Sequence, residues 1–102
     1  MSRLEQLRKL AMLEPSDPLT HYGLGIEYLN LQRYDEAVAA FDAALAADPR
    51  YSTAFYHKAR AQAGASRPDE ARRTLEAGMV VAREAGDWHA EGEMRGLLES
   101  LA

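Results

Sequence analysis

Histidines and carboxylates are the side chains of this sequence that could do acid–base or metal chemistry. The three histidines, His21, His57 and His89, lie 36 and 32 residues apart. His89 and Glu93 are spaced i, i+4, which would place two ligands on one helix face, but no third ligand is apparent. We therefore interpret the histidines as solvated or packing side chains and expect no metal site.

Two acidic pairs, Asp35-Glu36 and Asp69-Glu70, resemble an array of catalytic carboxylates. Each pair opens a predicted helix, where negative charge is stabilised by the positive end of the helix dipole. No phosphate-binding loop, nucleotide fingerprint or nucleophile elbow is present. The sequence therefore predicts a protein that is not an enzyme and that needs no cofactor.

Composition narrows the remaining classes of function. The chain has 102 residues, of which 47% are apolar and 27% charged, and it is rich in alanine, a strong helix former. Its net charge of −4 argues against nucleic acid as a partner, because a phosphate-backbone binder needs a basic surface. No apolar stretch is long enough to span a membrane, cysteine is absent, and the charged N-terminus does not resemble a signal peptide. We expect a cytoplasmic protein.

Apolar spacing and helix-capping residues predict an all-α chain of about six helices. Asp17-Pro18 and Asp87 are expected to start helices, and Gly86 is expected to end one in the left-handed conformation. Connections of a few residues make neighbouring helices antiparallel. The helices are expected at about 2–13, 18–31, 35–47, 52–63, 68–86 and 87–102.

The sequence repeats with a step of thirty-four residues. The block Asp35-Glu36-Ala37 recurs as Asp69-Glu70-Ala71, and Tyr22, Phe41 and Pro15 align with Tyr56, Leu75 and Pro49. Small residues, Gly25 and Ala44 in one copy and Ala59 and Gly78 in the other, stand where two helix backbones would approach closely. Phe41 and Leu75 are expected to fill the space that these small residues leave.

This pattern resembles the tetratricopeptide repeat family, in which Leu-Gly, tyrosine, alanines around an aromatic residue and a closing proline recur. The first copy has these residues at the family's positions: Leu24, Gly25, Tyr28, Ala37, Phe41, Ala44 and Pro49. The second copy departs from the pattern at Lys58, Gln62 and Arg83. Because Arg83 replaces the closing proline, we expect the fifth helix to continue for about one more turn, to Gly86.

The resemblance implies a right-handed array of helix-turn-helix repeats, an α-solenoid that acts in protein–protein interaction. It divides the chain into a half-repeat helix (1–15), two repeats (18–51 and 52–85) and a C-terminal capping helix (87–102). The expected partner is a protein or peptide. Self-association, or stacking on further repeats of a longer solenoid, is the alternative function.

The second helix has two apolar faces, although a surface helix needs only one. His21, Leu24, Gly25, Tyr28 and Leu31 form the first face, and Leu19, Tyr22, Ile26 and Leu29 form the second. In the resembled family, the first helix of each repeat lines a concave groove. Carried over, the expected partner-binding residues are Leu19, Tyr22, Ile26, Leu29, Asn30, Tyr56 and Arg60.

Two interpretations of this second face stay open. It is either an open groove that recognises a peptide, or core that the first helix covers at Leu19, Tyr22 and Ile26. The family's clamp for acidic C-terminal tails is absent, since Tyr22, Ile26 and His57 stand at its positions. Any ligand is therefore expected to be held mainly by apolar and aromatic contacts.

Overall fold

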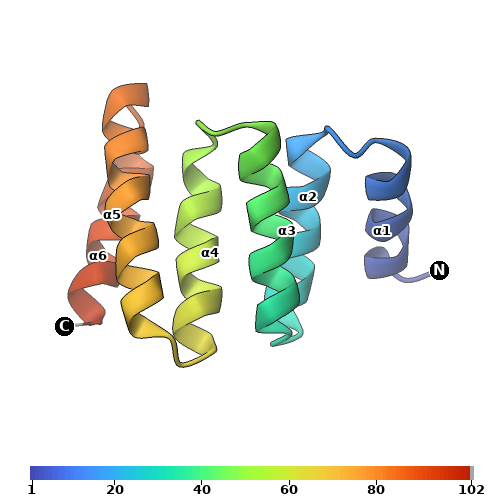
Figure 1. Ribbon diagram of the computed structural model, residues 1–102, viewed down its shortest axis with the longest axis horizontal. Helices are drawn as coiled ribbons and strands as arrows, with labels where there is room; N and C mark the ends of the chain where they lie inside the picture. Colours follow the sequence, from blue (N-terminus) through green and yellow to red (C-terminus); the bar gives the residue numbers. More distant parts are fainter. Residues whose placement is uncertain (102) are drawn as a thin grey trace.

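A computed structural model describes residues 1–101 of the chain, and their regular secondary structure is entirely α-helical. Ala102, the last residue of the predicted capping helix, lies outside the described residues. The helices stand side by side with short connections, and the two ends of the chain lie at opposite ends of the array (Figure 1). Their bounds are α1 Arg3–Leu13, α2 Pro18–Asn30, α3 Tyr34–Ala47, α4 Ser52–Gly64, α5 Pro68–Ala85 and α6 Trp88–Ser100.

Local capping chemistry explains where the helices begin. The Ser2 side chain accepts a hydrogen bond from the backbone N–H of Glu5 at 3.1 Å. Asp17 accepts from the N–H of Leu19 at 3.0 Å, and Asp87 accepts from the N–H of Ala90 at 3.1 Å. Each cap satisfies an N–H group that has no partner within its helix. The predicted starts at Asp17-Pro18 and Asp87 are therefore confirmed.

The two repeats end differently, as the sequence predicts. α3 stops at Ala47, and Asp48, which precedes a proline, has extended backbone angles. α5 runs for 18 residues and ends at Gly86, whose φ of 70° lies in the left-handed region that glycine adopts readily. Replacement of the closing proline by Arg83 thus gives a longer helix.

The helices pack in sequential pairs, and the array measures 40 × 28 × 18 Å. Each helix packs on its neighbours in the chain, and α4 also contacts α2 and α6. Among the described residues, α1 packs on α2 alone. The first helices of successive repeats therefore form a continuous layer from α2 through α4 to α6. α3 and α5 lie outside that layer; α3 packs on α2 and α4, and α5 packs on α4 and α6.

The core consists of small residues opposite large ones. A Cβ atom added at Gly25 would lie 2.6 Å from Cδ1 and Cζ of Phe41, whose side chain is fully buried. At Gly78, an added Cβ would lie 2.5 Å from Cβ of Phe55 and 2.6 Å from Sδ of Met94. The predicted small positions are therefore sites of close helix contact.

One residue of the predicted apolar stripe on α2 lies outside the core. Leu31 was expected to extend the first face of α2, but it is 55% exposed. The helix stops at Asn30, and Gln32 turns the chain with a positive φ of 59°, so Leu31 falls in the turn. Within residues 1–101, no helix is both long and apolar enough to cross a membrane.

Candidate partner-binding surface

The seven predicted partner-binding residues lie on two neighbouring helices of the inner layer, α2 and α4. They differ in exposure. Leu19 is 66% exposed, and Asn30 and Arg60 are also exposed. The others, Tyr22, Ile26, Leu29 and Tyr56, are half-buried. A half-buried aromatic residue can both support a core and offer a face to a partner.

Tyr22 lies in a cluster of aromatic rings that joins α2 to the second repeat. Its ring stacks on that of Tyr51, with centroids 5.0 Å apart, and lies 5.9 Å from the ring of Phe41. The imidazole of His57 meets Tyr22 edge-on at 5.6 Å and Tyr56 edge-on at 5.0 Å. His57 thus bridges the two predicted tyrosines, which are one repeat apart.

Arg60 supplies the positive charge at this surface. Its guanidinium carbon lies 5.9 Å from the centroid of the Tyr56 ring, within the range of a cation–π contact. The aromatic face holds the flexible arginine while the exposed guanidinium stays available to water or to a ligand. Tyr56 and Arg60 therefore present an aromatic ring and a hydrogen-bond donor side by side on the surface.

A hollow of about 480 Å³ lies between α1 and α2, and we call it the N-terminal hollow. Three of the predicted residues, Leu19, Tyr22 and Ile26, belong to its α2 wall. The remaining lining residues are Arg3, Leu7, Thr20 and Gly23. The first helix therefore leaves part of this face uncovered, since Leu19 is exposed and Tyr22 and Ile26 are half-buried. Like Tyr22 and Ile26, Leu29 packs against the core cluster of the first repeat, but neither Leu29 nor Asn30 lines the hollow. That cluster contains Leu24, Tyr28, Ala37, Ala40, Phe41 and Ala61.

His57 and Tyr51 belong to the aromatic cluster, although the pattern of the repeat did not predict them as site residues. His57 directly follows Tyr56 and was interpreted from the sequence as a solvated or packing histidine. Burial among the rings and, to a smaller extent, the nearby charge of Arg60 together lower the pKa of His57 to about 4. Its Nδ1 atom is buried and has no hydrogen-bond partner among the described residues. The imidazole is therefore neutral at pH 7.

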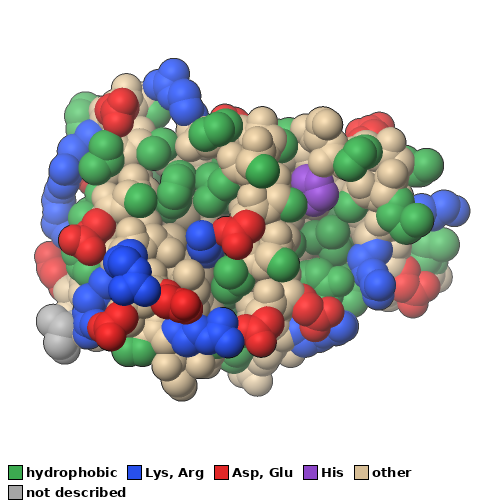
Figure 2. All heavy atoms as spheres, viewed as in Figure 1, with side chains coloured by type: hydrophobic (Ala, Val, Ile, Leu, Met, Phe, Trp, Pro, Cys, Tyr) green, Lys and Arg blue, Asp and Glu red, His purple; other side chains and the backbone are tan. Residues whose placement is uncertain are grey.

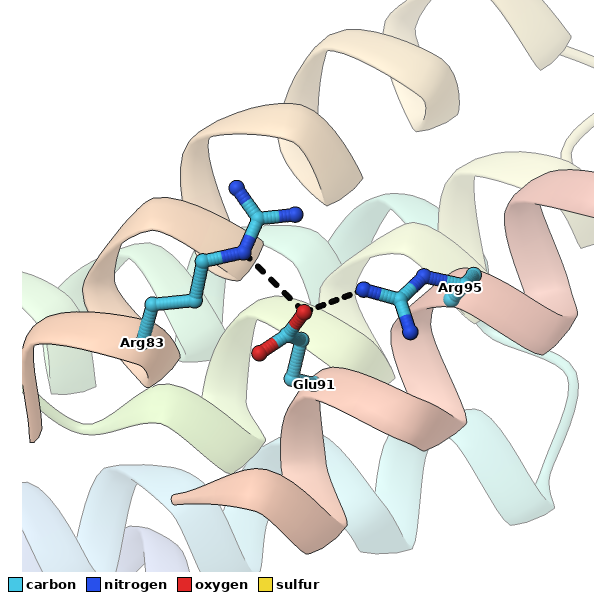
Figure 3. A network of polar contacts seen from close by, with 3 residues as sticks. All are labelled: Arg83, Glu91 and Arg95. Carbon is cyan, nitrogen blue, oxygen red and sulfur yellow. Dashed lines mark hydrogen bonds and ion pairs between the residues drawn. The ribbon is translucent and has the colours of Figure 1, made fainter. Parts of the chain in front are cut away.

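Other titratable groups gather at the opposite end of the array. Glu91 is only 7% exposed and accepts hydrogen bonds from Arg83, at 3.0 Å, and from Arg95 (Figure 3). Hydrogen bonding by Arg83 is the main reason that the pKa of Glu91 is lowered. His89 and Glu93 form a pair at 3.3 Å. No group of three potential metal ligands is found within residues 1–101.

The charged side chains on the broad face of the array are of mixed sign. Acidic and basic groups alternate along its lower edge, where α3 and α5 begin (Figure 2). Arg33 pairs with Glu36 at 2.6 Å, and Arg67 pairs with Asp35 at 3.0 Å. These pairs are solvent-exposed and each contributes little to stability. This edge has no single sign of charge that would attract a polyanion.

Comparison of the sequence with known protein families finds a match to one family. The sequence profile described as "Tetratricopeptide repeat" matches residues 22–88, which is well over half of the chain. Among curated proteins, no sequence matches this chain.

Solved structures share the whole architecture. Protein BPP2914 from Bordetella parapertussis is 27% identical, with a TM-score of 0.86 over 99% of this chain and 88% of its own. A tetratricopeptide repeat domain protein from Salinibacter ruber is 31% identical, with a TM-score of 0.77 over 85% of this chain and 88% of its own. The TPR2B domain of yeast Sti1, solved in complex with pHsp70, is 21% identical, with a TM-score of 0.91 over 96% of this chain and 78% of its own.

Proposed function

Because this chain belongs to the tetratricopeptide repeat family, whose members are protein-interaction modules, we propose that it binds a peptide or partner segment on the α2–α4 surface. The proposed contacts are those predicted from the sequence: Leu19, Tyr22, Ile26, Leu29, Asn30, Tyr56 and Arg60. The proposed role is non-catalytic.

The observation that supports this surface most directly is the row of rings across α2 and α4. Tyr22, His57 and Tyr56 follow one another with centroids 5.0–5.6 Å apart, and Arg60 lies over the last ring. Aromatic residues and arginine contribute a large share of the binding energy at protein interfaces, because they bury much area at little entropic cost. Half-buried rings are already positioned, so a ligand does not have to order them.

The ligand chemistry follows from the side chains in this row. The rings and Leu19 favour apolar and aromatic side chains, whereas Arg60 favours a carboxylate or a backbone carbonyl beside them. The yeast Sti1 domain has the same fold and was solved in complex with pHsp70. This supports the proposal that the present chain also binds a peptide. Since the family's clamp residues are replaced by Tyr22, Ile26 and His57, we propose that recognition depends on contacts with ligand side chains.

We also propose the repeat division 18–51 and 52–85, preceded by a half-repeat (1–15) and followed by a capping helix (87–102). The equivalent pairs Gly25 with Phe41 and Ala59 with Leu75 support it, because all four residues are buried. A small residue meets a large one at the same place in both repeats. The division therefore rests on packing as well as on sequence spacing.

A random peptide library selected on the immobilised chain tests the binding surface. Selected peptides should be enriched in aromatic and acidic residues. Their affinity for Tyr56→Ala should fall about tenfold, which corresponds to about 1.4 kcal/mol. Arg60→Glu should lower the affinity for acidic peptides more than the affinity for other peptides.

Val80→Ala is the matched control, because Val80 is 50% exposed on α5 and lies outside the proposed surface. Its affinity for the selected peptides should equal that of the parent. If no peptide is selected, or if Tyr56→Ala and Arg60→Glu bind as tightly as the control, the binding surface proposed here is wrong.

A further inference from the structure

The three helices of the inner layer have equal lengths, so their residues can be compared position by position. α2, α4 and α6 each contain 13 residues. Burial supports this comparison, because the third residue of every one of these helices is buried: Thr20, Ala54 and Ala90. Glu93 on α6 therefore occupies the position that His57 has on α4.

Glu93 lies close enough to the row of rings to act on it. Burial raises the pKa of the Tyr22 hydroxyl, the charge of Glu93 raises it further, and the charge of Arg60 acts in the opposite direction. Charges influence a hydroxyl in this way only at short range, because salt and water screen them with distance. The proposed binding surface therefore continues from α2 and α4 onto α6.

Neither Arg60 nor Glu93 has a fixed counter-charge. Lys58, the other basic residue of α4, pairs with Asp42 at 2.7 Å. Arg60 is exposed and takes part in no ion pair within residues 1–101. Glu93 pairs with His89 at 3.3 Å, and that imidazole compensates the carboxylate only when it is protonated. The surface thus offers a positive and a negative charge to a partner.

The two charges lie on neighbouring helices at different heights. α4 and α6 are in contact and run in the same direction, because α5 returns the chain between them. Glu93 is level with His57, three residues before Arg60, which corresponds to a rise of about 4.5 Å. Packed helices lie about 8–10 Å apart, so the two residues start from backbone positions about 10 Å apart. An extended peptide spans that distance in about three residues.

The surface of α6 beside Glu93 is open to a ligand. Gly92 and Gly96 stand where α4 has Tyr56 and Arg60. A Cβ added at either glycine would meet no atom within 4 Å, and 38% of the Glu93 side chain is exposed. A peptide that crosses from α4 to α6 can therefore reach the carboxylate without displacing another side chain.

The opposite signs of these charges decide between kinds of peptide. A purely acidic segment would bring a second carboxylate toward Glu93, and a purely basic segment would bring a cation toward Arg60. Like charges at an interface are destabilising, so each of these ligands is penalised at one of the two helices. A segment that carries both signs satisfies both side chains.

We propose that Glu93 is a specificity-determining residue of this surface and that the ligand is a peptide of mixed charge. An acidic side chain of the peptide binds Arg60, and a basic side chain about three residues away binds Glu93. An aromatic or apolar side chain beside them packs on the ring of Tyr56. This inference rests on the proposed function, since it assigns a ligand chemistry to the same surface.

Selection from the random peptide library, made separately on the parent and on Glu93→Gln, tests the basic contact. Peptides selected on the parent should be enriched in lysine or arginine about three residues from an acidic residue. Glu93→Gln removes the charge at nearly constant size. Peptides selected on this variant should keep the acidic residue and lose the enrichment in lysine and arginine.

Glu99→Gln is the matched control, because it makes the same change on the same helix. Glu99 is exposed and stands six residues after Glu93, about 1.7 helical turns away, so it belongs to another face of α6. Peptides selected on Glu99→Gln should have the same basic enrichment as those selected on the parent.

One selected peptide, synthesised with its basic residue and with glutamine in its place, gives the size of the contact. On the parent, the glutamine peptide should have a dissociation constant about threefold to tenfold higher. On Glu93→Gln, the two peptides should bind equally. The difference on the parent should shrink as salt is added, because the contact is exposed. The change in the peptide leaves the protein untouched, so this measurement decides even if Glu93→Gln melts at a lower temperature.

Equal enrichment of basic residues on the parent and on Glu93→Gln would overturn the inference. Selected peptides that are acidic throughout, or a glutamine peptide that binds the parent as tightly as the basic one, would also overturn it. If binding depends on Tyr56 but not on Glu93, the proposed function stands and only this inference is wrong. If no peptide is selected, or if Tyr56→Ala binds like Val80→Ala, both are wrong.

Discussion

Adding one methyl group at Gly25 tests the close contact between α2 and α3 most directly. The new Cβ atom would lie 2.6 Å from two atoms of the Phe41 ring, well inside van der Waals contact. The ring is fully buried, and Tyr22 and His57 lie against it, with centroids 5.9 Å and 6.1 Å away. Neither the ring nor the helix can therefore move aside freely.

The magnitude is the difference between two effects. Overpacking a dense core costs about 1–3 kcal/mol. Replacing glycine by alanine within a helix gains about 0.5–1 kcal/mol, because alanine loses less conformational freedom on folding. Gly25→Ala should therefore lower the free energy of unfolding by about 1 kcal/mol, and by at most about 2.5 kcal/mol. In a domain of this size the melting temperature should fall by about 4–8 °C per kcal/mol.

The chain contains its own control for this substitution. Gly92 also lies inside a helix, but no atom lies within 4 Å of an added Cβ. Gly92→Ala should therefore raise the melting temperature, since only the gain in helix propensity remains. Thermal unfolding followed by circular dichroism at 222 nm compares both variants with the parent. We expect the melting temperature to fall for Gly25→Ala and to rise for Gly92→Ala.

The second repeat suggests a compensating change. Ala59 and Leu75 occupy the positions of Gly25 and Phe41, and both are fully buried. Gly25→Ala combined with Phe41→Leu should therefore recover part of the stability lost by the two single variants, with a coupling of about 0.5–3 kcal/mol. If Gly25→Ala melts at or above the parent, or if the two changes are simply additive, the contact is not the steric constraint described here.

Three further predictions concern the aromatic cluster and the C-terminal end. Tyr22→Ala should destabilise the domain by about 2–4 kcal/mol because its ring packs on three others, whereas Tyr56→Ala should cost clearly less; equal melting temperatures would contradict this. The pKa of His57 is about 4 in the folded chain and lies below its ordinary value of 6.5, so the unfolded chain binds the proton first and stability should fall as pH drops between these values. Allowing for solvent screening of a partly exposed ring, the free energy of unfolding should fall by about 1–2 kcal/mol over this pH range. His57→Phe should therefore reduce the slope of stability against pH between pH 7 and pH 5. The pKa of Glu91 is lowered by Arg83 and Arg95, so its contribution is present at neutral pH and lost in acid. Glu91→Gln should therefore lower the melting temperature at pH 7 and make little difference at pH 3, and an equal loss at both pH values would count against an ionic role.

Several features of the fold were predictable because they depend on neighbouring residues. Asp17 and Asp87 cap helices through their own side chains, and Gly86 adopts a conformation that other residues avoid. Each of these signals acts within one helical turn. For the same reason the extra length of α5 could be inferred from Arg83 in place of proline.

The repeat also made some long-range contacts predictable. Once a step of thirty-four residues is recognised, Gly25 and Ala59 are expected in equivalent places, and so are Phe41 and Leu75. A small residue in one helix opposite a large one in the next then predicts the observed contact of Gly25 with Phe41. Leu31 shows the limit of such patterns. Its spacing suited the apolar face of α2, but the helix ended one residue earlier and left its side chain exposed.

The candidate site was predictable only in outline. Helical periodicity assigned Tyr22 and Tyr56 to one surface, but it could not show that the His57 ring lies between their rings, because a position in the repeat does not fix the direction in which a side chain turns. The environment of this imidazole depends on rings from α2, α3 and α4, which no local pattern encodes. Its lowered pKa follows from that burial.

The sequence by itself determined the helices, their order and the small-to-large contacts within each repeat, since these follow from backbone conformation and a regular period. Only the tertiary structure decided how far α1 covers α2. The N-terminal hollow and the half-burial of Tyr22 and Ile26 depend on where one helix lies relative to another, and on the absence of a side chain at Gly23. Burial is a property of all the helices together, and periodicity gives only the direction in which each side chain points.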